Sequence, residues 1–444
     1  MPRRFLTQLY HEAILAVHPA RAVSDTLHSL RFAESTETTT HLVAIGKAAL
    51  DMMDAARSYC DERALTVAGG IAISHVDGPA PSPGFDVCVG DHPVPSERSA
   101  HASARLAAYV ETNIRPGDHV IVLLSGGASS LIGAPRDLLN AQDYRAVNRA
   151  LLGAGLNITD MNLLRRRISR WGGGRLGAAL QARGADVSVL AISDVIGNNL
   201  AAIGSGPCIP DASSDADVAA VLHRAVVTQA FRERFRAMIA QTRSTRAPAT
   251  PTAPSPIPHH IIGSNRVALA AVERIARGDS RRLETRIVDA PLTGEAHACG
   301  AQVAHELLSA ATSPQNVAAA PRTRIVCWGG EPTVTLPAGA PPGGRMQALA
   351  LSAARVLDSV RDHARGITIL AAGTDGRDGD TTAAGAIIDA MTWRAIAASG
   401  RNPGDDDAQF RSHASLRAID ALLPAFASGT NVNDVVIAVI DSPR

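Results

Sequence analysis

The sequence predicts an α/β protein, with two α/β domains built on mainly parallel sheets. Three observations favour this fold class. The chain has 444 residues, enough for two or three domains. Its apolar runs are continuous rather than alternating, which is typical of parallel strands that helices cover on both faces. Each run ends in small or polar residues before a helical pattern begins, and this strand–helix alternation is characteristic of α/β folds.

Strand and helix patterns alternate along the chain. The predicted strands are 43–45, 120–124, 187–192, 324–328, 367–371 and 435–440. The predicted helices are 19–32, 96–112, 141–153, 218–241, 266–277 and 347–364. Ligands of such sheets bind at the carboxyl ends of the strands. The polar residues that follow each strand are therefore the candidate site residues.

Two breaks divide the chain into domains. Residues 244–258 are rich in Pro, Ala and Thr, which predicts an exposed Pro-rich loop, and 337–344 is a shorter Pro/Gly-rich break. We expect an N-terminal α/β domain over 1–243, with about 320 as an alternative limit, and a C-terminal α/β domain over 322–444.

Composition excludes several functional classes. The net charge of +1 and the aromatic content of 3% give no footprint for nucleic acid. No run approaches the ~18 apolar residues of a membrane span, and polar residues interrupt the basic N-terminus where a signal peptide needs an apolar run. The five cysteines are scattered without a C-x-x-C pair, as expected for reduced thiols. We expect a cytoplasmic protein that binds neither nucleic acid nor membrane.

Lys47 is the only lysine of the chain, beside 42 arginines. Lysine is a compact, rotatable charge, whereas arginine is a planar fork, so the one retained lysine sits where arginine would serve poorly. It follows a predicted strand and Gly46 at the start of a helix, where backbone N–H groups favour an anion. Chance retention is the alternative reading. The Walker A loop is excluded, because His41 and Ala48 stand where it needs Gly and Ser or Thr.

Two glycine-rich segments suit anions. Ser125-Gly126-Gly127-Ala128-Ser129-Ser130 follows a strong apolar strand, and six small residues there favour a phosphate nest over a plain turn. The letters G-x-G-x-x-G over 172–177 follow a basic segment instead of a strand, so they do not predict dinucleotide binding. We interpret them, with Arg175, as a basic loop near an anion.

Acidic and basic side chains follow other strands. Asp194 could hold Mg²⁺ or act as a general base, or it could simply cap a helix. Arg345, at a helix start, suits a carboxylate or phosphate, although a surface ion pair is the plainer reading. The loop 373–382, which contains Asp375, lacks the last glutamate of an EF-hand. We therefore interpret it as a polar strand-end loop that faces a nucleotide, a metal or the substrate.

These residues together favour phosphoryl transfer, which depends on positioning and on charge neutralisation. The sequence has no defensible Ser-His-Asp order and no metal-ligand histidine spacing. His92, in 90–95, is the only histidine inside a motif-like stretch.

Ordered motifs along nearly the whole chain resemble the type II glycerate kinases, which join an N-terminal kinase domain to a C-terminal MOFRL domain. The matching segments are 45–49, 90–95, 124–129, 173–176, 192–195, 204–207, 329–333, 343–347, 373–376 and 429–434. The sequence departs from the family pattern at Ala128, where glycine is usual, and at 198–199, where acidic residues are usual.

The resemblance implies phosphorylation of D-glycerate to 2-phosphoglycerate with ATP and Mg²⁺, in an active-site cleft between the two domains. The alternatives are a 3-phosphoglycerate-forming kinase and a hydroxypyruvate reductase. Lys47 and Arg345 correspond to the family's catalytic lysine and arginine, and Asp194 is the candidate base or metal ligand. The expected substrate and nucleotide contacts are Ser125, Gly126, Gly127, Ser129, Arg175, Glu331, Asp375 and Asn431. The oligomeric state stays open, with a homodimer as one option.

Overall fold

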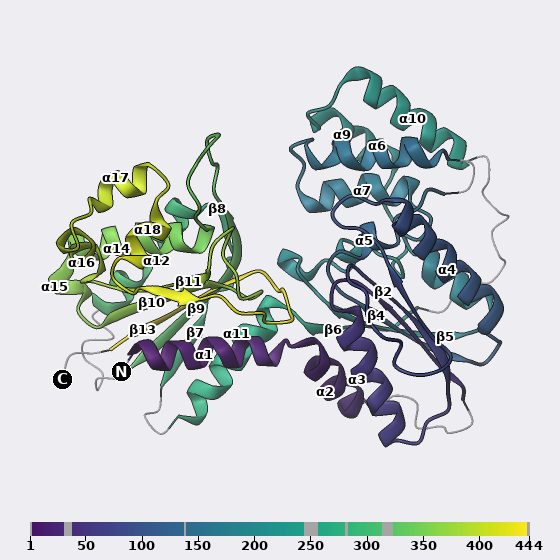
Figure 1. Ribbon diagram of the computed structural model, residues 1–444, viewed down its shortest axis with the longest axis horizontal. Coiled ribbons are helices and arrows are strands. Elements are labelled where there is room, and N and C mark those ends of the chain that lie inside the picture. Colours follow the sequence, from purple (N-terminus) through teal and green to yellow (C-terminus); the bar gives the residue numbers. More distant parts are fainter. Residues whose placement is uncertain are drawn as a thin grey trace. The chain divides into compact units, whose positions relative to one another are not determined.

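The computed structural model describes residues 2–30, 38–136, 139–243, 256–279, 283–312 and 323–441. These residues form two compact units (Figure 1). Unit 2 is Pro19–Ile262, and unit 1 joins Met1–His18 to Gly263–Arg444. The first helix and the segment after 262 thus fold with the C-terminal sheet, which differs in extent from the predicted ranges 1–243 and 322–444. Of the predicted loop 244–258, residues 244–255 lie outside the described part.

Unit 2 is built on a six-stranded sheet of order β3-β2-β1-β4-β5-β6, in which the four pairings among β1 to β5 are parallel. Its strands are β1 (Thr40–Ile45), β2 (Val67–Ser74), β3 (Phe85–Val89), β4 (His119–Leu124), β5 (Asp186–Ile192) and β6 (His259–Gly263). Its first helices are α2 (Pro19–Leu30), α3 (Ala49–Glu62), α4 (Glu97–Asn113), α5 (Ala128–Leu131) and α8 (Arg175–Ala182).

Helices cover both faces of this sheet. Val43 and Ile45 of β1 pack with Leu106 of α4 and Leu180 of α8 in one buried cluster. Side chains alternate along a strand, and α3 contacts β1, β2 and β4. The strands of unit 2 are therefore apolar throughout because they are buried on both faces, as the sequence predicted.

A second group of helices in unit 2 has its own core. It consists of α6 (Ala141–Leu152), α7 (Ile158–Ile168), α9 (Asp215–Arg224) and α10 (Gln229–Arg243), packed around Tyr144, Leu164 and Phe235 (Figure 1). The predicted single helix 218–241 is wrong, because the chain becomes extended at Ala225 between α9 and α10. Two short 3₁₀ turns, η1 (Ile196–Asn198) and η2 (Ile203–Ser205), follow β5.

Unit 1 contains a seven-stranded sheet of order β12-β11-β10-β13-β9-β7, with β8 also paired to β9. The strands are β7 (Glu284–Ile287), β8 (Leu292–Glu295), β9 (Arg324–Thr333), β10 (Ile367–Gly373), β11 (Ala383–Asp389), β12 (Leu422–Pro424) and β13 (Asp434–Ile440). The α/β prediction holds here, but the prediction of a mainly parallel sheet is wrong: only β7 and β8 run parallel to β9, and the other pairings are antiparallel.

The prediction of parallel strands in unit 1 fails for a simple reason. Helices cover both faces of this sheet too, so its strands are apolar throughout regardless of direction. In Figure 1, α1 (Pro2–Ala16) and α11 (Asn265–Gly278) lie side by side against one face, which their contacts with the sheet strands confirm. The other helices of unit 1 are α12 (Ala296–Thr312), α14 (Arg345–Ser359), α15 (Arg361–Ala364), α16 (Thr392–Ala398), α17 (Pro403–Ala408) and α18 (Ser412–Arg417). No described helix is long and apolar enough to span a bilayer.

Candidate active site

The strand order of unit 2 reverses between β1 and β4. The chain first builds outward from β1 through β2 and β3, and then continues on the other side with β4 and β5. In doubly wound sheets, such a switch point leaves a crevice at the carboxyl ends of the two central strands, where ligands bind. Ile45 and Leu124 end β1 and β4 and are paired in register. Lys47 and the 125–127 turn therefore meet at the switch point.

Backbone hydrogen bonds join these two turns. The Lys47 N–H donates to the Gly126 carbonyl at 2.9 Å, and the Ala48 N–H donates to Ser125 Oγ at 3.1 Å. Ser125 is buried, so its hydroxyl holds the β1–α3 turn in place. The Lys47 side chain is exposed. Helix α3 begins at Ala49, two residues after the predicted start at Lys47.

The side chains of Lys47 and His92 pack against Gly127. Its φ of +88° suits glycine, and an added Cβ would lie 3.1 Å from His92 Cδ2 and 3.3 Å from Lys47 Cγ. Partial burial and the Lys47 charge lower the pKa of His92, and they lower that of His75 as well. The charge of Lys47 thus helps to keep two imidazoles neutral. Sequence reasoning missed His75, although its place directly after β2 is the same strand-end signal.

Asp194 approaches the same turn from the next strand. It follows β5, the neighbour of β4, and an added Cβ at Gly126 would lie 2.3 Å from Asp194 Oδ2. Glycine is needed at 126 for this close approach. Lys47, Ser125–Gly127 and Asp194 are therefore gathered at one edge of the sheet, as the sequence predicted, although their chemical roles stay predictions.

Ser129 and Arg175 make hydrogen bonds within the protein. Ser129 Oγ lies 2.7 Å from Ser205 Oγ. Arg175 Nε donates to the carbonyls of Ser169 (3.0 Å) and Arg170 (3.2 Å). Burial, with the charge of Arg136, lowers the pKa of Arg175 to about 10. Arg175 therefore holds the segment before α8, and the prediction that it binds a ligand remains untested.

Arg345 is the first residue of α14 in unit 1 and contacts two carboxylates. Its Nε lies 2.6 Å from Asp434 Oδ2, and its Nη1 lies 3.3 Å from Glu331 Oε1. These acids come from the start of β13 and from β9. Burial raises the pKa of Asp434, and Arg345 opposes that effect. Arg345 thus forms the ion pair that was the simpler prediction for it. The pair is half-buried rather than on the surface, and it fixes the position of the guanidinium.

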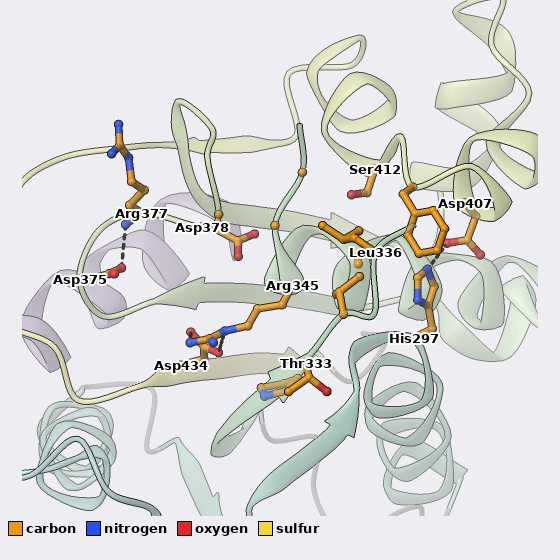
Figure 2. Close-up of a pocket in the computed structure, with 17 residues that line it drawn as sticks. His297, Thr333, Leu336, Arg345, Asp375, Arg377, Asp378, Asp407, Ser412 and Asp434 are labelled. Atoms are coloured by element: carbon orange, nitrogen blue, oxygen red, sulfur yellow. Dashed lines mark hydrogen bonds and ion pairs between the residues drawn. The ribbon is translucent and has the colours of Figure 1, made fainter. Parts of the chain in front are cut away.

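Arg345 lines a cavity of about 520 Å³ (Figure 2). Asp375 and Asp434 share its wall, whereas Glu331 and Asn431 are not among the lining residues. On the other side from Arg345, Figure 2 shows His297 pointing at Asp407, with 2.9 Å between Nε2 and Oδ1. Val334, Leu336 and Phe410 make part of the wall apolar. Many charged and polar side chains beside fewer apolar ones, in a volume of this size, suit a polar small molecule.

Asp378 organises the cavity; it belongs to the acidic loop 373–382, but the sequence did not single it out from the other carboxylates there. Its buried carboxylate accepts the N–H groups of Met346 (3.0 Å) and Gln347 (2.8 Å), so it caps α14, which lacks a cap of its own. Asn431 has a comparable local role, because its Oδ1 accepts the Asn433 N–H at 3.0 Å. Asp378 lies more than 30 residues from the start of the helix that it caps, so the sequence offers no local pattern by which this role could be predicted.

The predicted residues therefore form two sets, one in each compact unit. The cleft predicted between the two domains stays a prediction. No group of three or more His, Cys, Asp or Glu side chains gathers as a metal site in the described part of the chain.

Two family descriptions match the chain. Residues 5–240 match "Domain of unknown function (DUF4147)", and residues 324–434 match the "MOFRL family". A D-glycerate 2-kinase of Thermotoga maritima is 32% identical over 441 residues, which cover 99% of this chain and 98% of that protein. This chain belongs to the type II glycerate kinase family.

Further relatives agree with this assignment. A glycerate 2-kinase of Pyrococcus horikoshii is 30% identical, with coverage of 98% of this chain and 97% of that protein. The crystal structure of a glycerate kinase from Thermotoga maritima matches with a TM-score of 0.82 and 31% identity, covering 98% of this chain and 99% of that one. The relatives and the solved structure thus agree on a kinase with a two-domain α/β fold.

Proposed function

We propose that this protein transfers the terminal phosphoryl group of ATP to the 2-hydroxyl of D-glycerate. The observation that carries the proposal is the exposed Lys47 at the switch point of the unit 2 sheet, with Asp194 approaching the same turn. The names of the Thermotoga and Pyrococcus relatives support the substrate and the position of phosphorylation.

Lys47 has the chemistry that this reaction needs. Phosphoryl transfer has little covalent chemistry for the protein to perform, and charge on the transferring group must be neutralised. A flexible ammonium group that projects from a fixed backbone turn serves this role. Asp194 has two candidate roles, accepting the proton of the substrate hydroxyl or binding Mg²⁺.

A single carboxylate at the turn fits Mg²⁺, because this ion commonly takes one or two carboxylates and completes its shell with water and phosphate oxygens. Mg²⁺ supplies charge neutralisation on the phosphates when it is bound. Arg345 is proposed to take part in the same reaction. If Lys47 and Arg345 depend on each other in the same catalytic step, the kcat of the double variant Lys47→Met/Arg345→Met will be no lower than that of the worse single variant.

An ADP-release assay with D-glycerate, ATP and Mg²⁺ tests the proposal, with L-glycerate as the matched control. Phosphorus NMR of the product separates 2-phosphoglycerate from 3-phosphoglycerate. The expected result is turnover with the D-enantiomer and a 2-phosphoglycerate signal. Absence of turnover with either enantiomer would overturn the proposal, and a 3-phosphoglycerate signal would replace its regiochemistry.

The strand order of unit 2 is one observation that favours the hydroxypyruvate reductase alternative, because dinucleotide-binding folds share it. The turn after β1, however, carries Gly46-Lys47 instead of a glycine-rich fingerprint. The 172–177 glycines lie between α7 and α8, with no strand before them. NADH oxidation with hydroxypyruvate is therefore expected to stay at background.

A further inference from the structure

Three consecutive arginines on α7 have different surroundings. Arg166 Nε and Arg167 Nε each lie 3.4 Å from a carboxylate oxygen of Asp211. Arg166 also donates to the Ala201 carbonyl at 2.8 Å, and Arg167 to Ser213 Oγ at 3.0 Å. The Nε atoms of all three are buried without a hydrogen-bond partner, but Arg165, which is 8% exposed, also leaves its Nη2 unbonded. It has no carboxylate partner among the described residues.

A buried guanidinium without a counter-charge destabilises a fold. Arginine remains charged in proteins even where burial lowers its pKa, as it does here. The ionisable group that interacts with Arg165 is Tyr144, a buried phenol whose own pKa is raised by burial, so it stays neutral. Positions that break the rules of stable packing tend to be functional. The missing partner of Arg165 is therefore expected to be an anion from outside the chain.

Hydrogen bonds connect the Arg165 face of α7 to the candidate active site. Asn162 lies three residues earlier, on the same side of the helix. Its Oδ1 accepts the hydroxyl of Ser205 at 3.0 Å, and Ser205 Oγ lies 2.7 Å from Ser129 Oγ. Ser129 belongs to α5, which begins directly after the Gly127 turn.

The charge of Arg165 acts on a group at the same turn. Partial burial and the charge of Lys47 are the larger causes that lower the pKa of His92, and the charge of Arg165 adds to them. His92 and Lys47 both pack against Gly127. An exposed cation, Lys47, and a buried cation, Arg165, therefore act on one group, and the hydroxyls of Ser129 and Ser205 belong to the hydrogen-bonded chain that leads to the turn.

We propose that Arg165 forms the buried end of an oxyanion site and that the carboxylate of the hydroxy-acid substrate binds there. This assignment rests on the proposed function. A carboxylate matches the bidentate geometry of one guanidinium, and its single negative charge neutralises one buried cation. A nucleotide phosphate is the second source of an oxyanion, but its several charges exceed what one buried cation balances.

The decisive comparison is Arg165→Met with Arg167→Met, which alters a neighbouring, carboxylate-paired arginine of the same helix. Arg165→Met should raise the KM for D-glycerate about 10- to 150-fold, the range for hydrogen bonds to charged groups, with the KM for ATP unchanged. Without ligand its melting temperature should rise, because an unpaired buried charge has been removed. Arg167→Met should lower the melting temperature and leave both KM values unchanged.

Two further arms keep the proposal falsifiable. Arg165→Lys retains the charge but loses the fork, so its KM for D-glycerate should lie between those of the wild type and Arg165→Met. Thermal shifts of the wild type and Arg165→Met with D-glycerate, glycerol or inorganic phosphate measure binding without turnover. A shift by D-glycerate that Arg165→Met abolishes supports the proposal even if the phosphorylation assay fails.

Four results would overturn it. A change in the KM for ATP alone, or a shift by phosphate and not by D-glycerate, assigns the site to a phosphate. An Arg165→Met variant that melts at a lower temperature and still responds to D-glycerate has only lost a structural residue. An equal rise in the KM for D-glycerate in Arg167→Met means that the effect belongs to the helix.

Discussion

Lys47 combines a fixed backbone with an exposed side chain. Its N–H is bonded to the Gly126 carbonyl, and the next N–H is bonded to Ser125 Oγ. The turn is therefore held by its own hydrogen bonds and not by the ligand. Ser125 was predicted as a ligand contact, and the sequence could not reveal that its hydroxyl is used for this internal bond.

The replacement Lys47→Arg should lower kcat about 100-fold or more, the range for the loss of one well-placed donor to a transition state. The planar guanidinium is longer and less free to rotate than the ammonium, so it misses the transferring group. Steady-state kinetics measure the effect. Arg105→Lys, at the exposed ion pair with Asp86, is the control and should keep its kcat. A Lys47→Arg variant with full activity would show that charge alone suffices there.

The replacement Gly127→Ala should lower both stability and activity, whereas Gly117→Ala should lower stability alone. Both glycines have a φ of +88°, so each alanine costs roughly 1–2 kcal/mol in backbone strain. A Cβ at 127 also meets His92 and Lys47, whereas at 117 it has no neighbour within 4 Å. Denaturant titration and kcat measure the two effects. Equal activity in the two variants would mean that the position of Lys47 is unimportant.

Among the elements of unit 1, helix α17 is joined to α12 by His297 and Asp407. Arg355 of α14 lies 3.6 Å from the second oxygen of Asp407. The hydrogen bond to Asp407 raises the pKa of His297 above its ordinary value of 6.5. Three helices that border the cavity thus meet at one buried carboxylate. Nothing in the local sequence of α17 predicts which helix supplies its partner.

This contact should make the packing of α17 depend on pH. The folded protein binds the proton of His297 more tightly than the unfolded chain, so the stabilisation is complete below pH 6.5 and is lost as pH rises through the raised pKa. The fall in melting temperature caused by His297→Gln should be larger near about pH 5.5 than near about pH 9. Ser309→Ala, at an exposed site of the same helix that carries no ionisable group, should show no such difference. A loss that does not change with pH would mean that the charge of His297 contributes nothing.

At the scale of the whole molecule, strand-end reasoning succeeded where one stretch of sequence carries all the information. It predicted the α/β class, the positions of β1, β4, β5 and β13, and the gathering of Lys47, the 125–127 turn and Asp194. It failed where two distant segments must be known together. Strand direction in unit 1 is one case, because burial on both faces makes either direction apolar. The buried Arg165 is another, since a run of three arginines fits a solvated or a phosphate-facing helix edge and does not tell which of the three is buried without a counter-charge.

The assignment of α1 to unit 1 is a further long-range feature. Leu6, Leu9 and Tyr10 are fully buried, and Tyr10 Oη donates to the Gly373 carbonyl at 2.5 Å. No helix was predicted before residue 19. Nothing in the local sequence tells which of the two sheets covers α1, so the first 18 residues were expected to fold with the sheet that follows them.

The replacement Leu9→Ala should therefore destabilise the distant C-terminal sheet. A cavity of this kind costs about 2–5 kcal/mol. Amide hydrogen exchange should accelerate within 263–441 and remain unchanged within 19–262. Leu15→Ala, at an exposed site of the same helix, should change neither region. Faster exchange confined to 19–262 would contradict the division into units.

The interrupted course of unit 1 has a consequence for biosynthesis. Helix α1 leaves the ribosome before residues 19–262, and the sheet that it covers follows only afterwards. At typical elongation rates this takes roughly 10 to 50 s. During that time the apolar side of α1 has no native partner, while unit 2 has all of its own strands. A nascent chain that stalls before β9 should thus contain a folded unit 2 and an α1 whose apolar face is exposed. Chaperones bind intermediates with exposed apolar surface of this kind.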